Sequence, residues 1–328
     1  MHASRNLIAL LPAVLPALFA TVLPLPAAAQ AYPQKQIRMI VSSPPGSAPD
    51  IIARILGEKL TQSLGQAVVI DNKPGGGGIV SMNALRQAPA DGYTIGIPQA
   101  AVVTVTPYTY KEATYDIERD FETIAMVANT PMLFVTAADS PARNLADAIA
   151  MAKAKPDQIA IGNPTRTSIP HLAAEMLAQK TSAIFQQVPF STTPQGIAAV
   201  VKGDVLFYVD GTAPLMPLVR SGRLRAVAVA AEKELAGLEG IPLARDSVPG
   251  LNMYGWFMVA APKGTPAAIV RRLNAEINLA LRLPDVVNKF REFGTYAMPG
   301  SVEEAQGFVK SEKALFGAVI RQAGLKPE

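Results

Sequence analysis

The residues best placed to contact a ligand lie in short turns of small side chains that follow β-branched or apolar runs. The first such turn spans residues 42–50 and comes directly after the run Ile37–Val41. Its glycine and small residues let a ligand approach the backbone, and Pro49 suits the start of a helix, where free amides form an anion site. The alternative is an ordinary tight turn in which Asp50 interacts favourably with the helix dipole.

The third such turn along the chain, residues 162–171, follows another apolar run and precedes a helical stripe. Thr167 or Ser168 can cap that helix and leave amides free for an anion. His171 either contacts a ligand or packs beside the helix start. Arg166 either grips a carboxylate through two parallel hydrogen bonds or lies on the rim in solvent. The sequence leaves both alternatives open.

Two further turns follow predicted strands. Residues 72–78 contain four consecutive glycines but match neither a Walker A loop nor a dinucleotide-binding turn, so nucleotide binding is not expected. This turn is either structural or a ligand contact. Asp210 ends the apolar run 205–209, where it either faces a ligand or caps a helix that starts near Ala213.

Alternating strands and helices must position these turns, because ligands of open α/β sheets bind outside the carboxyl ends of the strands. We expect strands at Ile37–Val41 and at residues 68–70, 93–97, 132–136, 159–161, 205–209, 225–229 and 256–260. We expect helices at residues 50–64, 80–87, 266–281, 284–293 and 301–323. This alternation predicts an α/β fold with mostly parallel sheets flanked by helices.

Domain boundaries must lie inside ordered chain, because the sequence contains no low-complexity linker. The candidates are residues 129–131 and 248–253. Two crossings imply that one lobe is inserted in the other. The predicted division is a first lobe made of residues 32–130 and 251–328, and a second lobe made of residues 131–250.

Composition excludes several classes of protein. The chain has 328 residues, 49% of them hydrophobic, a mean hydropathy of +0.22 and no cysteine, which removes disulfides and cysteine-based metal sites. The only histidines are His2 and His171, and no Gly-x-Ser-x-Gly motif is present, so a Ser-His-Asp triad is not expected. We expect no cofactor and no metal. A carboxylate-pair enzyme stays open.

The charge pattern argues against nucleic-acid binding. Thirty lysines and arginines against 26 acids give a net charge of +4, and the basic residues are scattered rather than clustered. Residues 1–31 have a basic start at Arg5, an apolar middle and a small-residue end, which is the pattern of a signal peptide. A membrane anchor is the alternative. The expected location is therefore the periplasm.

Several motifs recur in a known order along the chain. They are Tyr32-Pro33-x-Lys35, Pro44-Pro45-Gly46, Asp71-Asn72-Lys73-Pro74-Gly75, Ala90-Asp91-Gly92-Tyr93, Asp120-Phe121, His171-Leu172-Ala173-x-Glu175, Val188-Pro189-Phe190, Ser221-Gly222-Arg223-Leu224, Ala261-Pro262-x-Gly264-Thr265-Pro266 and Leu273-Asn274-x-Glu276. In this order they resemble the Bug family, the periplasmic substrate-binding proteins of tripartite tricarboxylate transporters.

The resemblance implies a two-lobed periplasmic-binding-protein fold of the Venus-flytrap kind, with a carboxylate-bearing solute held in the cleft between the lobes. It maps ligand contacts onto the first and third turns and onto the acid at the end of a strand. With Ser43 and His171 from the same turns, the candidate site residues are Ser43, Gly46, Ser47, Ala48, Asp50, Asn163, Thr165, Arg166, Thr167, Ser168, His171 and Asp210.

The expected function is capture of a small organic anion by a monomer that has transient contact with membrane permease subunits. An orphan binding protein that presents its ligand to a signalling partner is the alternative. The chain departs from the family where Ser47 follows Gly46 and where Thr165, Arg166 and Thr167 occupy a turn that is usually rich in glycine and serine.

Overall fold

The computed structural model describes residues 32–322, so the predicted signal peptide lies outside the described part. The strands are β1 (Ile37–Val41), β2 (Val68–Asn72), β3 (Thr94–Ile97), β4 (Phe121–Ala137), β5 (Ala160–Asn163), β6 (Gln186–Pro189), β7 (Phe207–Gly211), β8 (Leu224–Ala230), β9 (Tyr254–Pro262) and β10 (Tyr296–Ala297). The helices are α1 (Ala48–Leu64), η1 (Gly76–Gly78), α2 (Ile79–Arg86), α3 (Ala100–Thr104), α4 (Thr106–Thr109), α5 (Ile117–Asp120), α6 (Leu145–Ala154), α7 (Ile169–Thr181), α8 (Thr193–Lys202), α9 (Thr212–Arg220), α10 (Ala244–Ser247), α11 (Ala267–Arg282), α12 (Pro284–Glu292) and α13 (Val302–Gln322).

The strands form a mixed sheet in the order β2-β1-β3-β9-β4-β7-β5-β6, with β8 and β10 also paired to β4. At one end, β1 runs parallel to β2 and β3, and at the other end β5 runs parallel to β6 and β7. The central strand β4 is antiparallel to every partner. The sheet is thus parallel at its two ends, as expected, and antiparallel where the chain passes from one end to the other.

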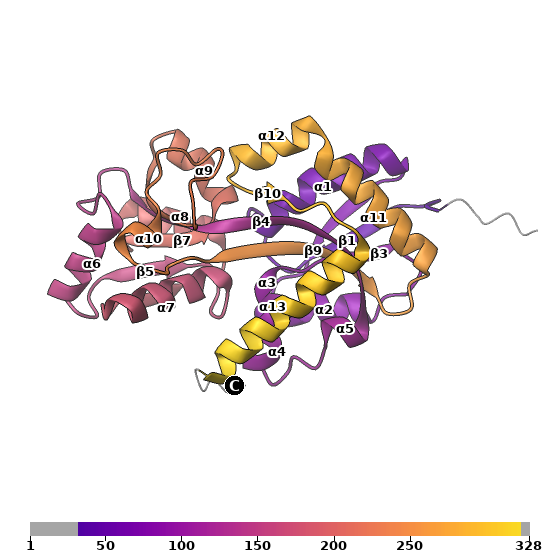
Figure 1. Cartoon of the computed structure of the whole chain (residues 1–328), viewed down its shortest axis with the longest axis horizontal. Coiled ribbons are helices and arrows are strands. Elements are labelled where there is room, and N and C mark those ends of the chain that lie inside the picture. The colour runs from indigo at the N-terminus through magenta and orange to yellow at the C-terminus, as the bar shows by residue number, and fades with distance from the viewer. Residues whose placement is uncertain (1–31, 323–328) are drawn as a thin grey trace, which may run out of the picture. The chain divides into compact units, whose positions relative to one another are not determined.

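Strand β4 joins the two ends of the sheet, and it changes partners at Pro131. Up to this residue it pairs with β9, whereas from Met132 onward it pairs with β7 and β8. Proline has no N–H to donate to a ladder, so it suits a point where pairing changes. Figure 1 shows β4 and β9 side by side between a group of helices around α6–α10 and a second group that includes α1 and α11–α13.

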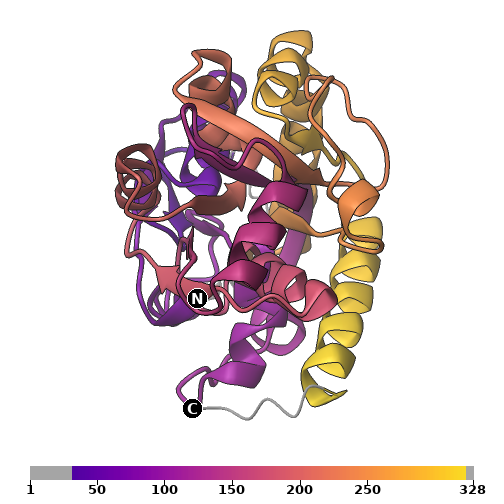
Figure 2. The same cartoon turned by 90° about the vertical axis from the view of Figure 1, so that its left-hand side faces the viewer.

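The central strands are buried on both faces. In β9 every residue from Gly255 to Pro262 is buried, and β4 is buried at all but a few positions. Strands covered on both faces read as continuous apolar runs rather than as an alternation. The helix α13 packs against β4 and α3 and runs along one side of the sheet (Figure 2). There the rings of Phe308 and Trp256 pack in a T-shaped pair, and the indole Nε1 donates to Glu312.

Local sequence sets where helices α1, α7 and α8 begin and where α1 and α8 end. Ser47, Ser168 and Thr192 precede α1, α7 and α8 in extended conformations typical of N-caps. Helix α1 ends at Gly65 and α8 at Gly203, both with positive φ, where glycine has no Cβ to clash. These signals place the starts of all three helices directly after strands or short turns.

Candidate ligand-binding site

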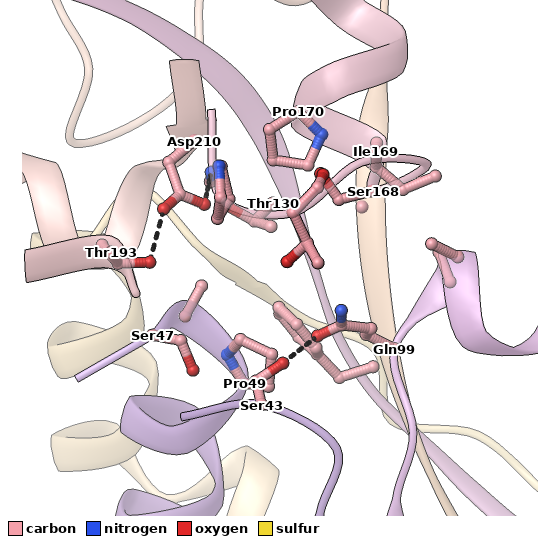
Figure 3. A pocket seen from close by; sticks show the side chains of 18 of the residues that line it. Ser43, Ser47, Pro49, Gln99, Thr130, Ser168, Ile169, Pro170, Thr193 and Asp210 are labelled. Carbon is pink, nitrogen blue, oxygen red and sulfur yellow. Dashed lines mark hydrogen bonds between the residues drawn. The ribbon is translucent and has the colours of Figure 1, made fainter. Parts of the chain in front are cut away.

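A cavity of about 60 Å³, the inner cavity, lies between the two groups of helices beside the point where β4 changes partners. Figure 3 shows Thr193 and Asp210 on one side of it, Ser43 and Gln99 on the other, and Thr130 of β4 between them. The first residues of helices α1, α7 and α8 and three residues of β9 also line it. Six candidate residues from the sequence line it: Ser43, Ser47, Ala48, Thr165, Ser168 and Asp210.

Three helices point their N-termini at the inner cavity. The cavity is lined by the first residues of α1, α7 and α8 together with the residue that precedes each helix. The same short pattern, a serine or threonine followed two residues later by proline, begins all three. The three copies are Ser47-Ala48-Pro49, Ser168-Ile169-Pro170 and Thr192-Thr193-Pro194.

This pattern leaves a specific set of backbone donors for a ligand. Proline at the second helical position has no N–H, and the capping hydroxyls of Ser168 and Thr192 accept the amide at the third position. Among the described residues, no acceptor is recorded for the first helical amides, those of Ala48, Ile169 and Thr193. Free amides at helix N-termini, reinforced by the helix dipoles, suit an anion.

Asp50 holds the first turn in its conformation through hydrogen bonds. Its carboxylate accepts hydrogen bonds from the Gly46 amide at 2.9 Å, from Asn72 Nδ2 at 2.9 Å and from Arg54, with which it also forms an ion pair at 2.9 Å. Burial by itself raises the pKa of Asp50, but the hydrogen bonds from Arg54, Gly46 and Asn72 outweigh it and lower the pKa overall. Asp50 does not line the cavity; it fixes the loop that does.

The first and third turns share one pattern of bonding. The Ser47 hydroxyl donates to the carbonyl of Pro44, three residues earlier, and the Ser168 hydroxyl donates in the same way to Thr165, both at 2.7 Å. The residue before each serine has positive φ, +79° at Gly46 and +61° at Thr167. A β-branched residue in this region is strained, and such strain is concentrated at functional sites.

Asp210 is buried in the wall of the inner cavity. Its carboxyl group accepts hydrogen bonds from the Thr193 hydroxyl at 2.9 Å, from the Tyr208 hydroxyl at 3.3 Å and from the Gly211 amide at 2.7 Å. Burial raises its pKa to about 6, against these three hydrogen bonds. A Cβ at Gly196 would lie 2.1 Å from the Tyr208 ring, so glycine is required there for Tyr208 to pass under α8.

Two side-chain pairs hold the remaining polar walls. Ser43 donates from its hydroxyl to Gln99 Oε1 at 2.9 Å, which joins the ends of β1 and β3. Thr130 and Thr212 share a hydrogen bond of 2.8 Å between their hydroxyls, and the Thr212 amide donates to Thr130 Oγ1 at 3.1 Å. Both pairs are internally satisfied, so these walls are set in place before a ligand enters.

A second cavity of about 480 Å³, the outer cavity, adjoins the inner one. The two share lining residues such as Ser43, Gln99, Thr165 and Ser168. Arg166 lines only the outer cavity and is exposed. The remaining walls include Thr167 and the glycine-rich turn 74–78. That turn, for which the sequence left structural and ligand-contact roles open, therefore faces solvent-accessible space beside the candidate site.

Four candidate residues lie outside both cavities. Gly46 and Asp50 belong to the supporting network of the first turn described above. Asn163 is fully buried at the end of β5, where its Nδ2 donates to Gln187 Oε1 at 3.1 Å. His171 forms a 3.6 Å pair with Glu175, and burial lowers its pKa. All four belong to the structure of the turns and the adjoining elements, not to the cavity walls.

Sequence reasoning missed several cavity residues, of which Gln99, Thr130, Ser191, Thr192 and Thr193 are uncharged polar residues. The repeated serine- or threonine-x-proline pattern at helix starts is a signal that would have found Thr192 and Thr193. Gln99 lies between the end of β3 and the start of α3. A residue at such a strand-to-helix turn could also have been predicted to contact a ligand. Thr130 carries no such signal, because only the crossing of β4 brings it to the cavity.

Within residues 32–322, no helix is long and apolar enough to cross a membrane, and no group of histidine, aspartate and glutamate side chains is arranged to hold a metal ion.

Comparisons with known proteins identify the family. The model of the tripartite tricarboxylate transporter family receptor matches residues 52–325. BugT of Bordetella pertussis is 31% identical over 307 residues, which cover 92% of this chain and 93% of BugT. The solved structure of an R. palustris protein with adipate has a TM-score of 0.86 and 29% identity, and the match covers 90% of this chain and all of that one.

The periplasmic binding protein BugD has a TM-score of 0.84 and 27% identity, with the match covering 90% of this chain and all of BugD. These likenesses confirm the predicted α/β periplasmic-binding-protein fold, and they exclude the carboxylate-pair enzyme that the sequence left open. The chain therefore belongs to the tripartite tricarboxylate transporter receptor family, the Bug family, whose members are binding proteins.

Proposed function

We propose that this protein is a periplasmic solute-binding protein that captures a small carboxylate-bearing organic anion in the inner cavity and delivers it to a membrane transporter. The observation that carries the proposal is the convergence of α1, α7 and α8 on a cavity that, in its described lining, has no lysine or arginine. Three helix starts provide partial positive charge and free amides, which suit a single carboxylate.

The chemical class of the ligand is supported by a relative. The R. palustris protein solved with adipate is 29% identical to this chain and matches 90% of it. Adipate carries carboxylates, which accept hydrogen bonds from amides through two oxygens. The proposed direct contacts are Ser43, Ser47, Ala48, Thr165, Ser168 and Asp210. The residues proposed to shape the turns that carry these contacts are Gly46, Asp50, Asn163, Thr167 and His171.

The proposed motion is a closure of two lobes around the ligand. Residues 32–130 and 251–328 form one lobe and residues 131–250 the other, and β4 and β9 connect them. Pro131, where β4 changes partners, supports a hinge at this crossing because proline donates no N–H to either ladder. In this proposal residues 1–31 direct export to the periplasm, and the monomer in its closed, liganded form makes transient contact with permease subunits.

Native mass spectrometry of protein purified from the periplasm tests the proposal. We expect a protein species heavier than the mature chain that releases a small organic acid on denaturation, and the released acid should restore the heavier species when added back. A released molecule that lacks any carboxyl group would overturn the proposal. Released acid that fails to rebind to refolded protein would also count against it.

A further inference from the structure

The outer cavity indicates what the far end of the ligand carries. We infer that Arg166 binds a second anionic group of the ligand there, so that the protein selects molecules with two negative groups over equally long molecules with one. This inference rests on the proposed function, because it takes the first carboxylate to lie at the three helix starts.

The sizes of the two cavities require the ligand to extend outward. A cavity of about 60 Å³ has room for roughly five water-sized groups, which is one carboxylate and a few carbons. The adjoining outer cavity is about 480 Å³. A longer carboxylate held at the helix starts must therefore place its other end in the outer cavity.

The charges of the two cavities differ in sign. Arg166 is the only charged side chain in the described lining of the outer cavity, and no ion pair is recorded for it in the described part of the chain. Asp210 is the only charged side chain in the described lining of the inner cavity. A second anionic group is attracted to Arg166, whose guanidinium can bind a carboxylate through two parallel hydrogen bonds.

The turn that carries Arg166 is held in place on both sides. Thr165 and Thr167 flank it with φ of +86° and +61°, a conformation that β-branched residues rarely adopt. The Thr167 hydroxyl donates to the carbonyl of Arg166 at 2.6 Å and reaches the Tyr110 hydroxyl at 3.5 Å. Strained, anchored backbone of this kind is kept where it positions a functional group.

The first and third turns differ at the position that Arg166 occupies in the third. The first and third turns share their serine-to-carbonyl bonding, and counting back from Ser47 and Ser168 aligns Pro45 with Arg166. Pro45 is exposed and lines neither cavity, whereas the side chain of Arg166 lines the outer one. The third turn thus adds a cation to a site that is otherwise built from uncharged groups and Asp210.

Calorimetric titration with matched acids tests the inference. The probes are the straight-chain dicarboxylates from succinate to suberate and the monocarboxylates of equal length, from butanoate to octanoate. The proteins are the wild type, Arg166→Gln, Arg166→Lys and the control Arg271→Gln, which removes the same charge from an exposed arginine that lines neither cavity.

We expect the wild type to bind its best dicarboxylate at least about tenfold more tightly than the matched monocarboxylate. Arg166→Gln should remove this preference by weakening only the dicarboxylate, Arg166→Lys should keep part of it, and Arg271→Gln should leave it unchanged. If Arg166→Gln keeps the wild-type preference, or if the wild type binds both series equally, the inference is overturned and the proposed function stands. If no acid of either series binds to the wild type, the inference is overturned, whereas the proposed function fails only if tricarboxylates and amino acids do not bind either.

Discussion

The hydroxyl of Thr193 donates a 2.9 Å hydrogen bond to the buried carboxyl group of Asp210. This bond joins the first turn of α8 to the end of β7, so an acid in the same cavity wall positions this helix start. Asp210 is also the group in the inner cavity whose pKa lies closest to neutrality, because burial raises that pKa to about 6. Both properties make Asp210 the natural target of experiments on pH.

The stability of the protein should fall as the pH rises from about 4 to about 6 through the contribution of Asp210. The folded state keeps the proton on Asp210 up to about pH 6, whereas the unfolded chain releases it near the ordinary value of 3.8. The folded state therefore binds more protons in this window, and the free energy of unfolding drops by about 3 kcal/mol across it. Above pH 6 this contribution is constant.

Urea unfolding of the wild type and of Asp210→Asn at a series of pH values measures this contribution. His171 has a lowered pKa and acts in the opposite direction near pH 6, so the difference between the two proteins isolates Asp210. The variant should lack the downward slope between pH 4 and pH 6. Equal slopes in both proteins would show that Asp210 titrates near its ordinary value.

Binding of a carboxylate should be accompanied by uptake of protons near pH 6.5. A negative charge placed in the cavity that Asp210 lines raises the pKa of this acid further, because both charges share a poorly solvated space. Titration calorimetry in two buffers of different ionisation enthalpy should give a heat difference that corresponds to a fraction of a proton. The same experiment on Asp210→Asn is the control, and a wild type that takes up no proton contradicts the prediction.

A single methyl group in the cavity wall should weaken binding by about tenfold. A Cβ at Gly211 would lie 3.2 Å from Thr130 Cγ2 and 3.4 Å from the Ala48 Cβ, and it would fill part of a cavity of only about 60 Å³. We expect Gly211→Ala to fold with a loss of about 1–3 kcal/mol of stability from overpacking and to lose affinity for the identified acid.

Gly307→Ala is the matched control for that substitution. It makes the same chemical change on the exposed side of α13, where nothing lies within 4 Å of the added Cβ. It should bind as the wild type does and be slightly more stable, since alanine favours a helix interior. If Gly211→Ala and Gly307→Ala have the same affinity, the inner cavity is not where the ligand lies.

Ligand should draw the two proposed lobes together about the crossing of β4 and β9. Closure shortens the distance between residues 32–130 and residues 131–250, so small-angle scattering should report a smaller radius of gyration with ligand than without it. Pro131→Ala, which restores an N–H at the point where β4 changes partners, should reduce the difference. A radius that does not change with saturating ligand contradicts the hinge.

Much of the fold was predictable, because strand ends and helix starts carry local signals. The strand at residues 37–41 and the helix starting at residue 284 were predicted with their observed starts. The strand expected at 132–136 is the last part of β4, which begins at Phe121 and includes residues 129–131, a candidate domain boundary. The short strand β6 was missed because its polar glutamines line the sheet edge.

The candidate site was predictable to the extent that it depends on single turns. Thr167 or Ser168 was predicted to cap a helix, and Ser168 does so; Asp210 was predicted as an acid at the end of a strand. Ser168 and Asp210 both line the cavity. Thr130 was not predictable, since it reaches the cavity only through the crossing of strand β4. Contacts that depend on tertiary packing cannot be predicted from the spacing of residues within one segment of the sequence.

The central claim is that carboxylates bind to the folded protein at the inner cavity. The most direct test is thermal unfolding of purified protein with a panel of mono-, di- and tricarboxylates and amino acids. Ligand at 100 times its dissociation constant adds about 2.7 kcal/mol, which should raise the melting temperature by roughly 5 °C. We predict such a shift with at least one carboxylate of the panel. Gly211→Ala should show about half of it, because tenfold weaker binding leaves about 1.4 kcal/mol at the same ligand concentration, and Gly307→Ala should show all of it. A melting temperature that no member of the panel changes would contradict the claim.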